Sequence, residues 1–208
     1  MTTSERKGLL RAEIRARRSA RSHAESLAVG AGLAVRLGSV AGIADLVADP
    51  GSGCVAAYSS TGTEPGTTAV RELLRISGVG VLLPVIGLQR SLGWAWDEGK
   101  LEVSEQSHGI AQPVGEIVGV GAAGVLALGV RVLLVPALAV DRAGRRLGQG
   151  GGFYDRVLAD LGSSPGSRPV VCAVVHDDEV LDAPGVPVEP FDQRVDAVLT
   201  PSSYLDLR

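Results

Sequence analysis

Short apolar runs alternate with segments of helical periodicity along most of the chain. The runs begin at Cys54, Val79, Val130, Pro169 and Ala197, and each is four to seven residues long. Buried strands have this length and composition, whereas amphipathic helices repeat their apolar positions every three to four residues. The alternation predicts an α/β fold, with residues 1–208 as a single domain. In this fold a mostly parallel, Rossmann-like central sheet is covered by helices on both faces, as three α/β/α layers.

Helical patterns fill the intervals between these runs. Helices are expected at residues 5–22, 25–40, 68–76 and 153–161. Thr67 directly precedes the third of them and is a candidate cap for its N-terminus. Trp94 and Trp96 alternate with small residues, so we assign them to packing in an edge strand.

The first predicted helix carries a basic stripe. Four basic residues follow one another at intervals of four, four and three: Lys7, Arg11, Arg15 and Arg18. These intervals place their side chains on one helix face, beside Leu10 and Ile14, which would dock the helix. We expect Lys7 to be exposed. The residues alone leave open whether the stripe is a solvated face or an anion-binding surface.

Composition narrows the classes of protein. The chain has 45% apolar residues and a net charge of −3, although residues 1–22 carry seven Lys or Arg against two Glu. The apolar content excludes a disordered chain, and the negative net charge gives no sign of a nucleic-acid partner. Cys54 and Cys172 stand in apolar runs as unpaired thiols, and the basic start has no apolar segment behind it. Residues 117–140 are apolar but are interrupted by Arg131 and Pro136. We expect a cytoplasmic monomer that does not bind membranes.

A glycine-rich turn stands between the third apolar run and the fourth helix. Four of five consecutive positions are glycine: Gly148, Gly150, Gly151 and Gly152. Such a turn lets backbone N–H groups converge on an anion, and the start of a helix adds partial positive charge. Arg145, Arg146 and Arg156 flank it. The glycine spacing matches neither a Walker loop nor a dinucleotide-binding fingerprint. Two interpretations of the turn therefore remain open: a phosphate site and a plain surface loop.

The sequence around this turn resembles the signature of the 5-formyltetrahydrofolate cyclo-ligase (5,10-methenyltetrahydrofolate synthetase) family. There Val-Pro-Gly-x-x-Phe-Asp leads into Gly-x-Arg-Leu-Gly-x-Gly-x-Gly-Tyr-Tyr-Asp-Arg. Here residues 135–141 read Val-Pro-Ala-Leu-Ala-Val-Asp, and residues 144–156 read Gly-Arg-Arg-Leu-Gly-Gln-Gly-Gly-Gly-Phe-Tyr-Asp-Arg. The departures are side-chain changes around a preserved backbone motif: Ala137, Val140, Gln149 and Phe153. The Lys-x-x-x-Arg at residues 7–11, the Glu-x-x-Thr at 64–67 and the Gly-Ile-x-Gln-Pro at 109–113 are also similar to family motifs.

The resemblance implies ATP- and Mg²⁺-dependent cyclisation of 5-formyltetrahydrofolate to 5,10-methenyltetrahydrofolate, with release of ADP and phosphate. The implied route passes through a phosphorylated formyl group, an iminium phosphate, and Arg146 would act on the transferred phosphoryl group. Implied nucleotide contacts are Lys7, Gly8, Leu9, Leu10, Arg11, Arg146, Leu147, Gly148, Gln149, Gly150, Gly151, Gly152, Phe153 and Tyr154. Implied folate contacts are Glu64, His108, Gln149, Gly150, Gly151, Gly152 and Phe153. The implied Mg²⁺ ligands are Asp155 and Asp192.

Two other interpretations remain at this point. The same kind of scaffold carries non-ligase proteins that bind phosphorylated metabolites, and a folate-binding paralogue could have lost turnover. Gly66, which stands where some relatives have a second acid, and Gln149 make the second interpretation conceivable. The run His176-Asp-Asp-Glu179 is assigned to helix capping, since consecutive residues cannot all converge on one metal ion.

Overall fold

The computed structural model describes residues 1–87, 91–103, 107, 109–164 and 168–208. The helices are α1 (Thr3–Ser19), α2 (His23–Arg36), α3 (Ile43–Ala48), α4 (Thr68–Ile76), α5 (Gly121–Ala127) and α6 (Phe153–Ser163). The central sheet contains β1 (Cys54–Ala56), β2 (Gly80–Ile86), β3 (Leu92–Trp96), β6 (Gly119–Val120), β7 (Val130–Pro136), β10 (Val170–Val174), β12 (Ala197–Leu199) and β13 (Tyr204–Asp206). Short strands β4 (Leu101–Glu102) and β5 (Gln112–Pro113) pair with each other.

The central sheet has the order β13-β12-β10-β7-β1-β2-β3-β6. The five strands from β12 to β2 pair in parallel, and β13, β3 and β6 are added antiparallel at the two sides. The prediction of a mostly parallel sheet is therefore confirmed. Apolar runs buried on both faces are typical of parallel strands, which explains why the central strands were recognisable in the sequence.

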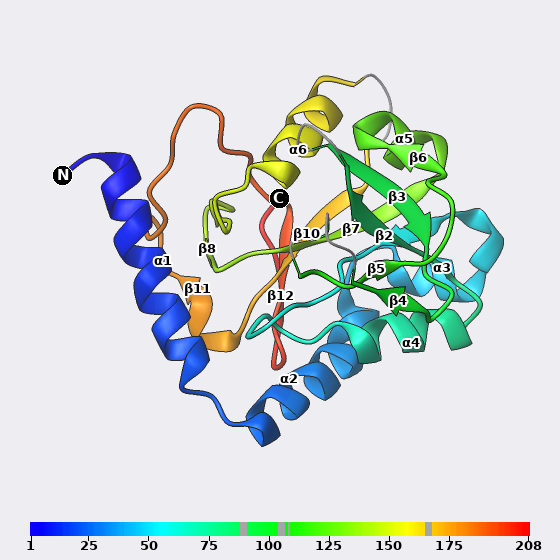
Figure 1. Ribbon diagram of the computed structural model, residues 1–208, viewed down its shortest axis with the longest axis horizontal. Coiled ribbons are helices and arrows are strands. Elements are labelled where there is room, and N and C mark those ends of the chain that lie inside the picture. Colours follow the sequence, from blue (N-terminus) through cyan, green and yellow to red (C-terminus); the bar gives the residue numbers. More distant parts are fainter. Residues whose placement is uncertain (88–90, 104–106, 108, 165–167) are drawn as a thin grey trace.

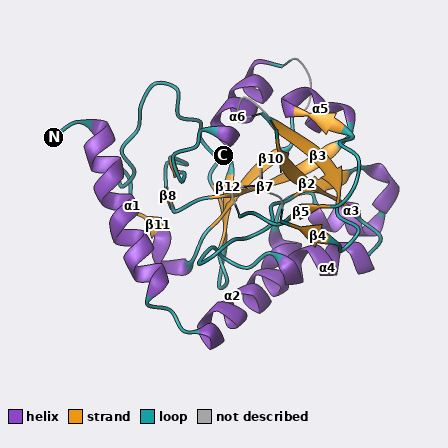
Figure 2. Cartoon of the chain, viewed as in Figure 1, coloured by secondary structure: helices purple, strands orange, loops and turns teal. Residues whose placement is uncertain are grey.

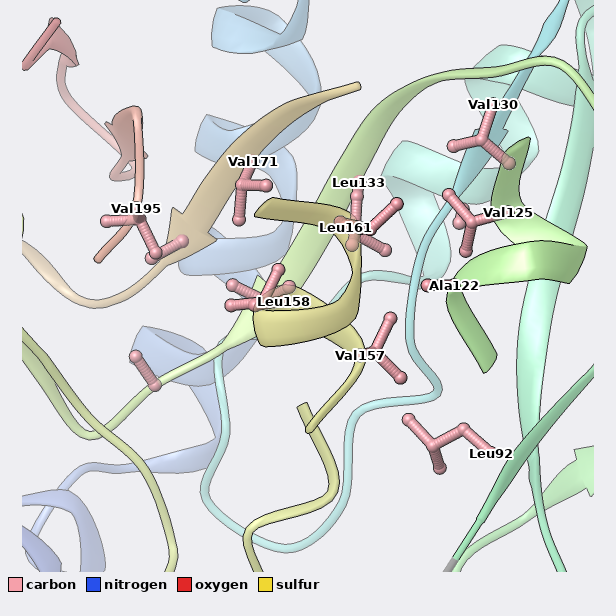
Figure 3. Close-up of a cluster of buried hydrophobic side chains, with 14 of the residues drawn as sticks. Leu92, Ala122, Val125, Val130, Leu133, Val157, Leu158, Leu161, Val171 and Val195 are labelled. Atoms are coloured by element: carbon pink, nitrogen blue, oxygen red, sulfur yellow. The ribbon is translucent and has the colours of Figure 1, made fainter. Parts of the chain in front are cut away.

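Helices cover both faces of this sheet (Figure 2). Along β7, Val132 and Leu134 point into a cluster with α2, α3 and α4, whereas Leu133 and Val135 point into a cluster with α5 and α6. Figure 3 shows Leu158 of α6 in this second cluster, which lies between the helix and the strands. Burial of each such side chain stabilises the fold by about 1.5–3 kcal/mol. Alternation along the strands thus produces the predicted three-layer arrangement.

Helix α1 lies outside these layers (Figure 1). It packs on a small second sheet with the order β11-β8-β9, made of β8 (Ala139–Asp141), β9 (Arg146–Leu147) and β11 (Val180–Leu181). Ile14 of α1 is fully buried against Leu138 and Leu147, as the docking role predicted for it requires. The glycine-rich turn follows β9 directly, so this packing brings the basic stripe of α1 next to the turn.

Some local predictions are wrong. Thr67 occupies the N-cap position of α4 but makes no side-chain cap, because its hydroxyl donates to the carbonyl oxygen of Tyr58 at 2.6 Å. The strand that carries Trp94 is not an edge, since β6 pairs with it on the outer side. Trp94 is fully buried and donates from its indole to the Gly121 carbonyl at 2.9 Å. Within the described part of the chain, no helix has the length and hydrophobicity needed to cross a membrane.

Candidate active site

A pocket of about 210 Å³ opens at the carboxyl ends of β1, β2 and β7. Open α/β sheets bind ligands at this edge, because the loops that follow parallel strands converge there. The glycine-rich turn forms one wall and the loop after β1 forms another. The lining residues are Tyr58, Ser59, Thr61, Glu64, Pro84, Ile86, Leu92, Ile110, Pro136, Arg146, Gly148, Gln149, Gly150, Gly151, Gly152, Phe153, Tyr154 and Asp155.

The glycine-rich turn needs its glycines for backbone geometry. Gly150 has φ +107° and Gly152 has φ +67°, values that other residues rarely adopt, and Gly152 is the N-cap of α6. Two arginines of α1 bind carbonyl oxygens of the turn. The Arg11 Nε donates to the Gly148 oxygen at 2.9 Å, and Arg15 donates to the backbone and side-chain oxygens of Gln149. Arg11 and Arg15 of the basic stripe therefore hold the turn in place.

Lys7 is buried rather than exposed, so the expectation of an exposed lysine is wrong. Its side chain is only 6% exposed, and its Nζ lies 2.5 Å from the Asp192 Oδ2 and 2.9 Å from the Glu189 Oε2. Phe191 places its ring 5.7 Å from the same nitrogen. The physical reason is charge compensation, because the segment between β11 and β12 supplies two carboxylates that let α1 turn Lys7 inward.

Arg146 and Asp155 form a second compensated pair. The Arg146 Nη2 donates to the Asp155 Oδ1 at 2.7 Å, and its Nη1 lies 3.3 Å from the Pro136 oxygen. The Arg146 side chain is 3% exposed, and its buried Nε has no hydrogen-bond partner among the described residues. A buried charge donor without a partner is costly, which makes this nitrogen a candidate ligand contact.

The segment that carries Asp192 contacts Asp155. The backbone N–H of Gln193, directly after Asp192, donates to the Asp155 Oδ1 at 3.5 Å. Each of the two carboxylates has its own cation, Arg146 for Asp155 and Lys7 for Asp192. In the described ranges, His, Cys, Asp and Glu do not form any group of three or more that could hold a metal ion. Protein ligands alone would therefore leave most positions of such an ion to phosphate or water.

The loop after β1 places Glu64 at the pocket. The Glu64 carboxylate accepts from the N–H of Thr61 at 3.0 Å and from the Thr61 hydroxyl at 3.3 Å. Tyr58 and Tyr154 line the same wall. Burial raises the pKa of both phenols, and the nearby negative charge of Glu64 raises it further, so both stay protonated at neutral pH. The buried Tyr154 hydroxyl has no partner among the residues described.

Seven of the predicted contacts do not line the pocket: Lys7, Gly8, Leu9, Leu10, Arg11, Leu147 and Asp192. Asp192 lines a separate hollow with Glu189 and Gln193. Gly8 and Leu9 lie on the exposed side of α1, away from the turn that Arg11 contacts. His108 lies outside the described residues, although Ile110, in the motif that follows it, lines the pocket. Glu189 and Tyr58 were not predicted. Glu189 stands near Asp192 in the sequence, but its partner Lys7 is 182 residues away, so no local pattern reveals the contact.

Comparison with known proteins identifies one family. A model of the 5-formyltetrahydrofolate cyclo-ligase family matches residues 3–201. The 5-formyltetrahydrofolate cyclo-ligase of Mycolicibacterium smegmatis is 40% identical over 153 residues, which cover 71% of this chain and 73% of that protein. The enzyme of the same name from Escherichia coli is 44% identical over 71 residues, or 34% of this chain and 36% of that protein.

Solved structures have the same fold. The NMR structure of the Aquifex aeolicus 5,10-methenyltetrahydrofolate synthetase superimposes with a TM-score of 0.73 at 24% identity, covering 97% of this chain and 93% of that one. The synthetase from Mycoplasma pneumoniae superimposes with a TM-score of 0.65 at 18% identity, covering 94% and 98%. With a family match over nearly its whole length, the chain belongs to the 5-formyltetrahydrofolate cyclo-ligase family.

Proposed function

We propose that this chain cyclises 5-formyltetrahydrofolate to 5,10-methenyltetrahydrofolate in a reaction that consumes ATP and requires Mg²⁺, with release of ADP and phosphate. Family membership supports the folate reaction. The observation that carries the ATP-dependent part is a pocket in which a glycine-rich turn and the buried Arg146 lie opposite the Glu64 loop. Such a pocket can hold a phosphate chain and an organic acceptor side by side.

The chemistry requires activation of a poor leaving group. In the proposed reaction the γ-phosphoryl group of ATP passes to the formyl oxygen and gives an iminium phosphate. The neighbouring arylamine nitrogen of the folate attacks the formyl carbon and loses its proton, and the C–O bond breaks as phosphate leaves. Phosphoryl transfer of this kind depends mostly on alignment and on neutralisation of charge, so the protein need not supply a nucleophile.

The nucleotide site is assigned to the turn and the two buried cations. Backbone N–H groups of residues 148–152 and the N-terminus of α6 would face the phosphates, while Arg11 and Arg15 keep the opposite, carbonyl side of the turn occupied. Arg146, with its unpartnered Nε, would contact the transferred phosphoryl group. Lys7 would supply a second positive charge.

Asp155 and Asp192 fit a Mg²⁺ site. Their oxygens are the hard ligands that this ion prefers, and two carboxylates beside a phosphate chain are a usual protein contribution. When bound, Mg²⁺ would neutralise the phosphate oxygens. In the absence of ligand, each carboxylate neutralises one cation of the nucleotide site. Lys7 and Arg146 would therefore turn from carboxylates to phosphate oxygens as the substrate enters.

The folate is assigned to the rest of the pocket. Ile86, Leu92, Ile110 and Phe153 give it apolar walls, and Glu64 supplies a polar contact of the type that fixes the orientation of a ring.

Glu64→Gln is expected to raise the KM for 5-formyltetrahydrofolate about tenfold, because a charge-assisted hydrogen bond to the substrate becomes a neutral one. The KM for ATP should change less than twofold. Initial rates from the absorbance of methenyltetrahydrofolate measure both constants. Glu72→Gln on the exposed face of α4 is the control and should behave like the wild type. Equal effects on the two KM values would contradict a folate contact.

The overall proposal is tested by following methenyltetrahydrofolate formation with and without ATP and Mg²⁺. Product only when both are present is the expected result. Folate binding without product would support a paralogue that has lost turnover. Binding of sugar phosphates in place of folate would support a non-ligase protein.

A further inference from the structure

The loop after β1, residues 57–67, is held in its conformation mainly by hydrogen bonds between its own residues. The Tyr58 hydroxyl donates to the Pro65 oxygen at 3.1 Å, and Thr61 binds Glu64 as described above. On one side Gly66 lies against α2, where a Cβ at Gly30 would come within 3.3 Å of the Gly66 oxygen. On the other side, the carbonyl oxygen of Thr63 lies 3.3 Å from the Nε2 of His176. This second contact adjoins Glu64 directly.

His176 is buried at the carboxyl end of β10. Since a carbonyl oxygen can only accept, the Nε2 must carry the proton that it shares with Thr63. Burial lowers the pKa of His176, and Arg21 and Arg18 lower it further, against the opposing effects of Glu179 and of the bond to Thr63. The ring is therefore neutral at pH 7, and a neutral ring with its proton on Nε2 satisfies the contact.

Glu179 connects His176 to helix α1. Its carboxylate is fully buried, accepts from the backbone N–H of His176 at 2.9 Å, and binds Arg18 through two bonds of 2.7 Å. Arg18 also donates to the oxygen of Ala137, next to the pocket residue Pro136. A hydrogen-bonded connection thus runs from Arg18 of α1 through Glu179 and His176 to the loop that carries Glu64.

This hydrogen-bonded connection is not needed to form the layers of the fold. A buried ion pair contributes little net stability compared with apolar packing, because its desolvation offsets its attraction. Buried polar networks can instead specify one arrangement of the segments that they join. In this network the Arg18 Nη1 has no hydrogen-bond partner among the described residues, so the link depends on the bonds from its Nε and Nη2. The segments joined here are the helix of Lys7 and Arg11 and the loop of Glu64, which face the two proposed substrates.

We propose that His176 is a positioning residue for the folate substrate: its bond to the Thr63 carbonyl holds the adjacent Glu64 toward the pocket, and Glu179 and Arg18 tie this arrangement to α1. The proposal deepens the proposed function and rests on it. His176 touches neither substrate and acts through Glu64.

The test compares three variants. His176→Phe keeps the ring volume and removes the donor, so the KM for 5-formyltetrahydrofolate should rise about three- to tenfold, as expected for one lost hydrogen bond, with kcat within about twofold. His176→Gln can place an amide N–H near the position of Nε2 and should restore most of the loss. Asp178→Asn, an exposed acid of the same turn that pairs with Arg17 and Arg21, is the control and should match the wild type. Should the Phe variant fail to fold, His176→Asn, whose amide is too short to reach Thr63, takes its place.

A double-mutant cycle separates positioning from general destabilisation. In a Glu64→Gln background, His176→Phe should change the folate KM by less than about twofold, because the group that it positions is already lost. An equal KM effect in both backgrounds, or an unchanged KM in folded His176→Phe, would overturn the proposal.

Amide hydrogen exchange tests the link without any substrate. Peptides that cover residues 59–67 should exchange faster in His176→Phe than in the wild type and the Asp178→Asn control. Unchanged exchange there would also overturn the proposal. A wild-type protein that forms no methenyltetrahydrofolate contradicts the proposed function instead, and leaves this exchange result to decide whether His176 restrains the loop.

Discussion

Asp155→Asn should reduce kcat by about a hundredfold or more and raise the Mg²⁺ concentration needed for half-maximal rate, as expected when a preorganised charge at a phosphoryl-transfer site is lost. The change keeps the size of the side chain and one acceptor oxygen, but it removes the negative charge that a Mg²⁺ ligand supplies. Initial rates over a Mg²⁺ titration at saturating ATP measure the effect.

The same variant should also be less stable without ligands. Arg146 is almost fully buried and would lose its anionic partner, while Asp155 itself is 26% exposed and keeps some solvent screening. The free energy of unfolding should therefore fall by about 1–3 kcal/mol, more than the roughly 0.3–1 kcal/mol expected for an exposed acid at a helix start. Urea denaturation of the ligand-free protein measures this difference.

Asp160→Asn is the matched control, because Asp160 lies on the exposed side of the same helix. It should leave the rate, the Mg²⁺ titration and the unfolding free energy close to those of the wild type. An Asp155→Asn enzyme with an unaltered Mg²⁺ titration curve would contradict the metal assignment, even if its stability falls as predicted.

Lys7→Ala is expected to weaken ATP binding about ten- to a hundredfold, the usual range for loss of one charged hydrogen bond. The structure adds a second reason. Without Lys7, the carboxylates of Glu189 and Asp192 remain as uncompensated negative charges beside the incoming phosphates. Since both acids would be left without their cation, the melting temperature should also fall. Nucleotide titration calorimetry and a thermal melt measure the two effects.

Arg6→Ala provides the comparison for Lys7→Ala. Arg6 is the neighbouring cation on α1, but it is exposed, and its side chain donates to the Thr3 hydroxyl through a weak bond of 3.4 Å. It should change neither ATP affinity nor melting temperature appreciably. A Lys7→Ala protein that melts lower but binds ATP with unchanged affinity would assign the lysine to a structural ion pair.

The central layers were predictable because their signal is local. The apolar run at residues 130–135 and the helical pattern of residues 68–76 agree with β7 and α4. Strands of two or three residues, such as β9 and β13, are too short to show a period, so the second sheet and the outer strands β6 and β13 could not be predicted.

Only the part of the candidate site that lies within the glycine-rich motif was predictable from the sequence. Residues 144–156 contain both the glycine-rich turn and the Arg146–Asp155 pair, whose members are nine positions apart. Lys7 pairs with Asp192 across 185 positions, and no pattern in either segment indicates the other. For this reason Lys7 was expected to be exposed.

The amino-acid sequence by itself determined the α/β class, the position of the glycine-rich turn and the resemblance to the cyclo-ligases, because periodicity and motif chemistry are properties of neighbouring residues. Only the tertiary structure decided which charges compensate one another. It placed α1 on the small sheet, gave Lys7 and Arg146 carboxylate partners, and joined Arg18 to the Glu64 loop through Glu179 and His176. These are contacts between distant segments, and burial of each charge required a partner that only folding brings within reach.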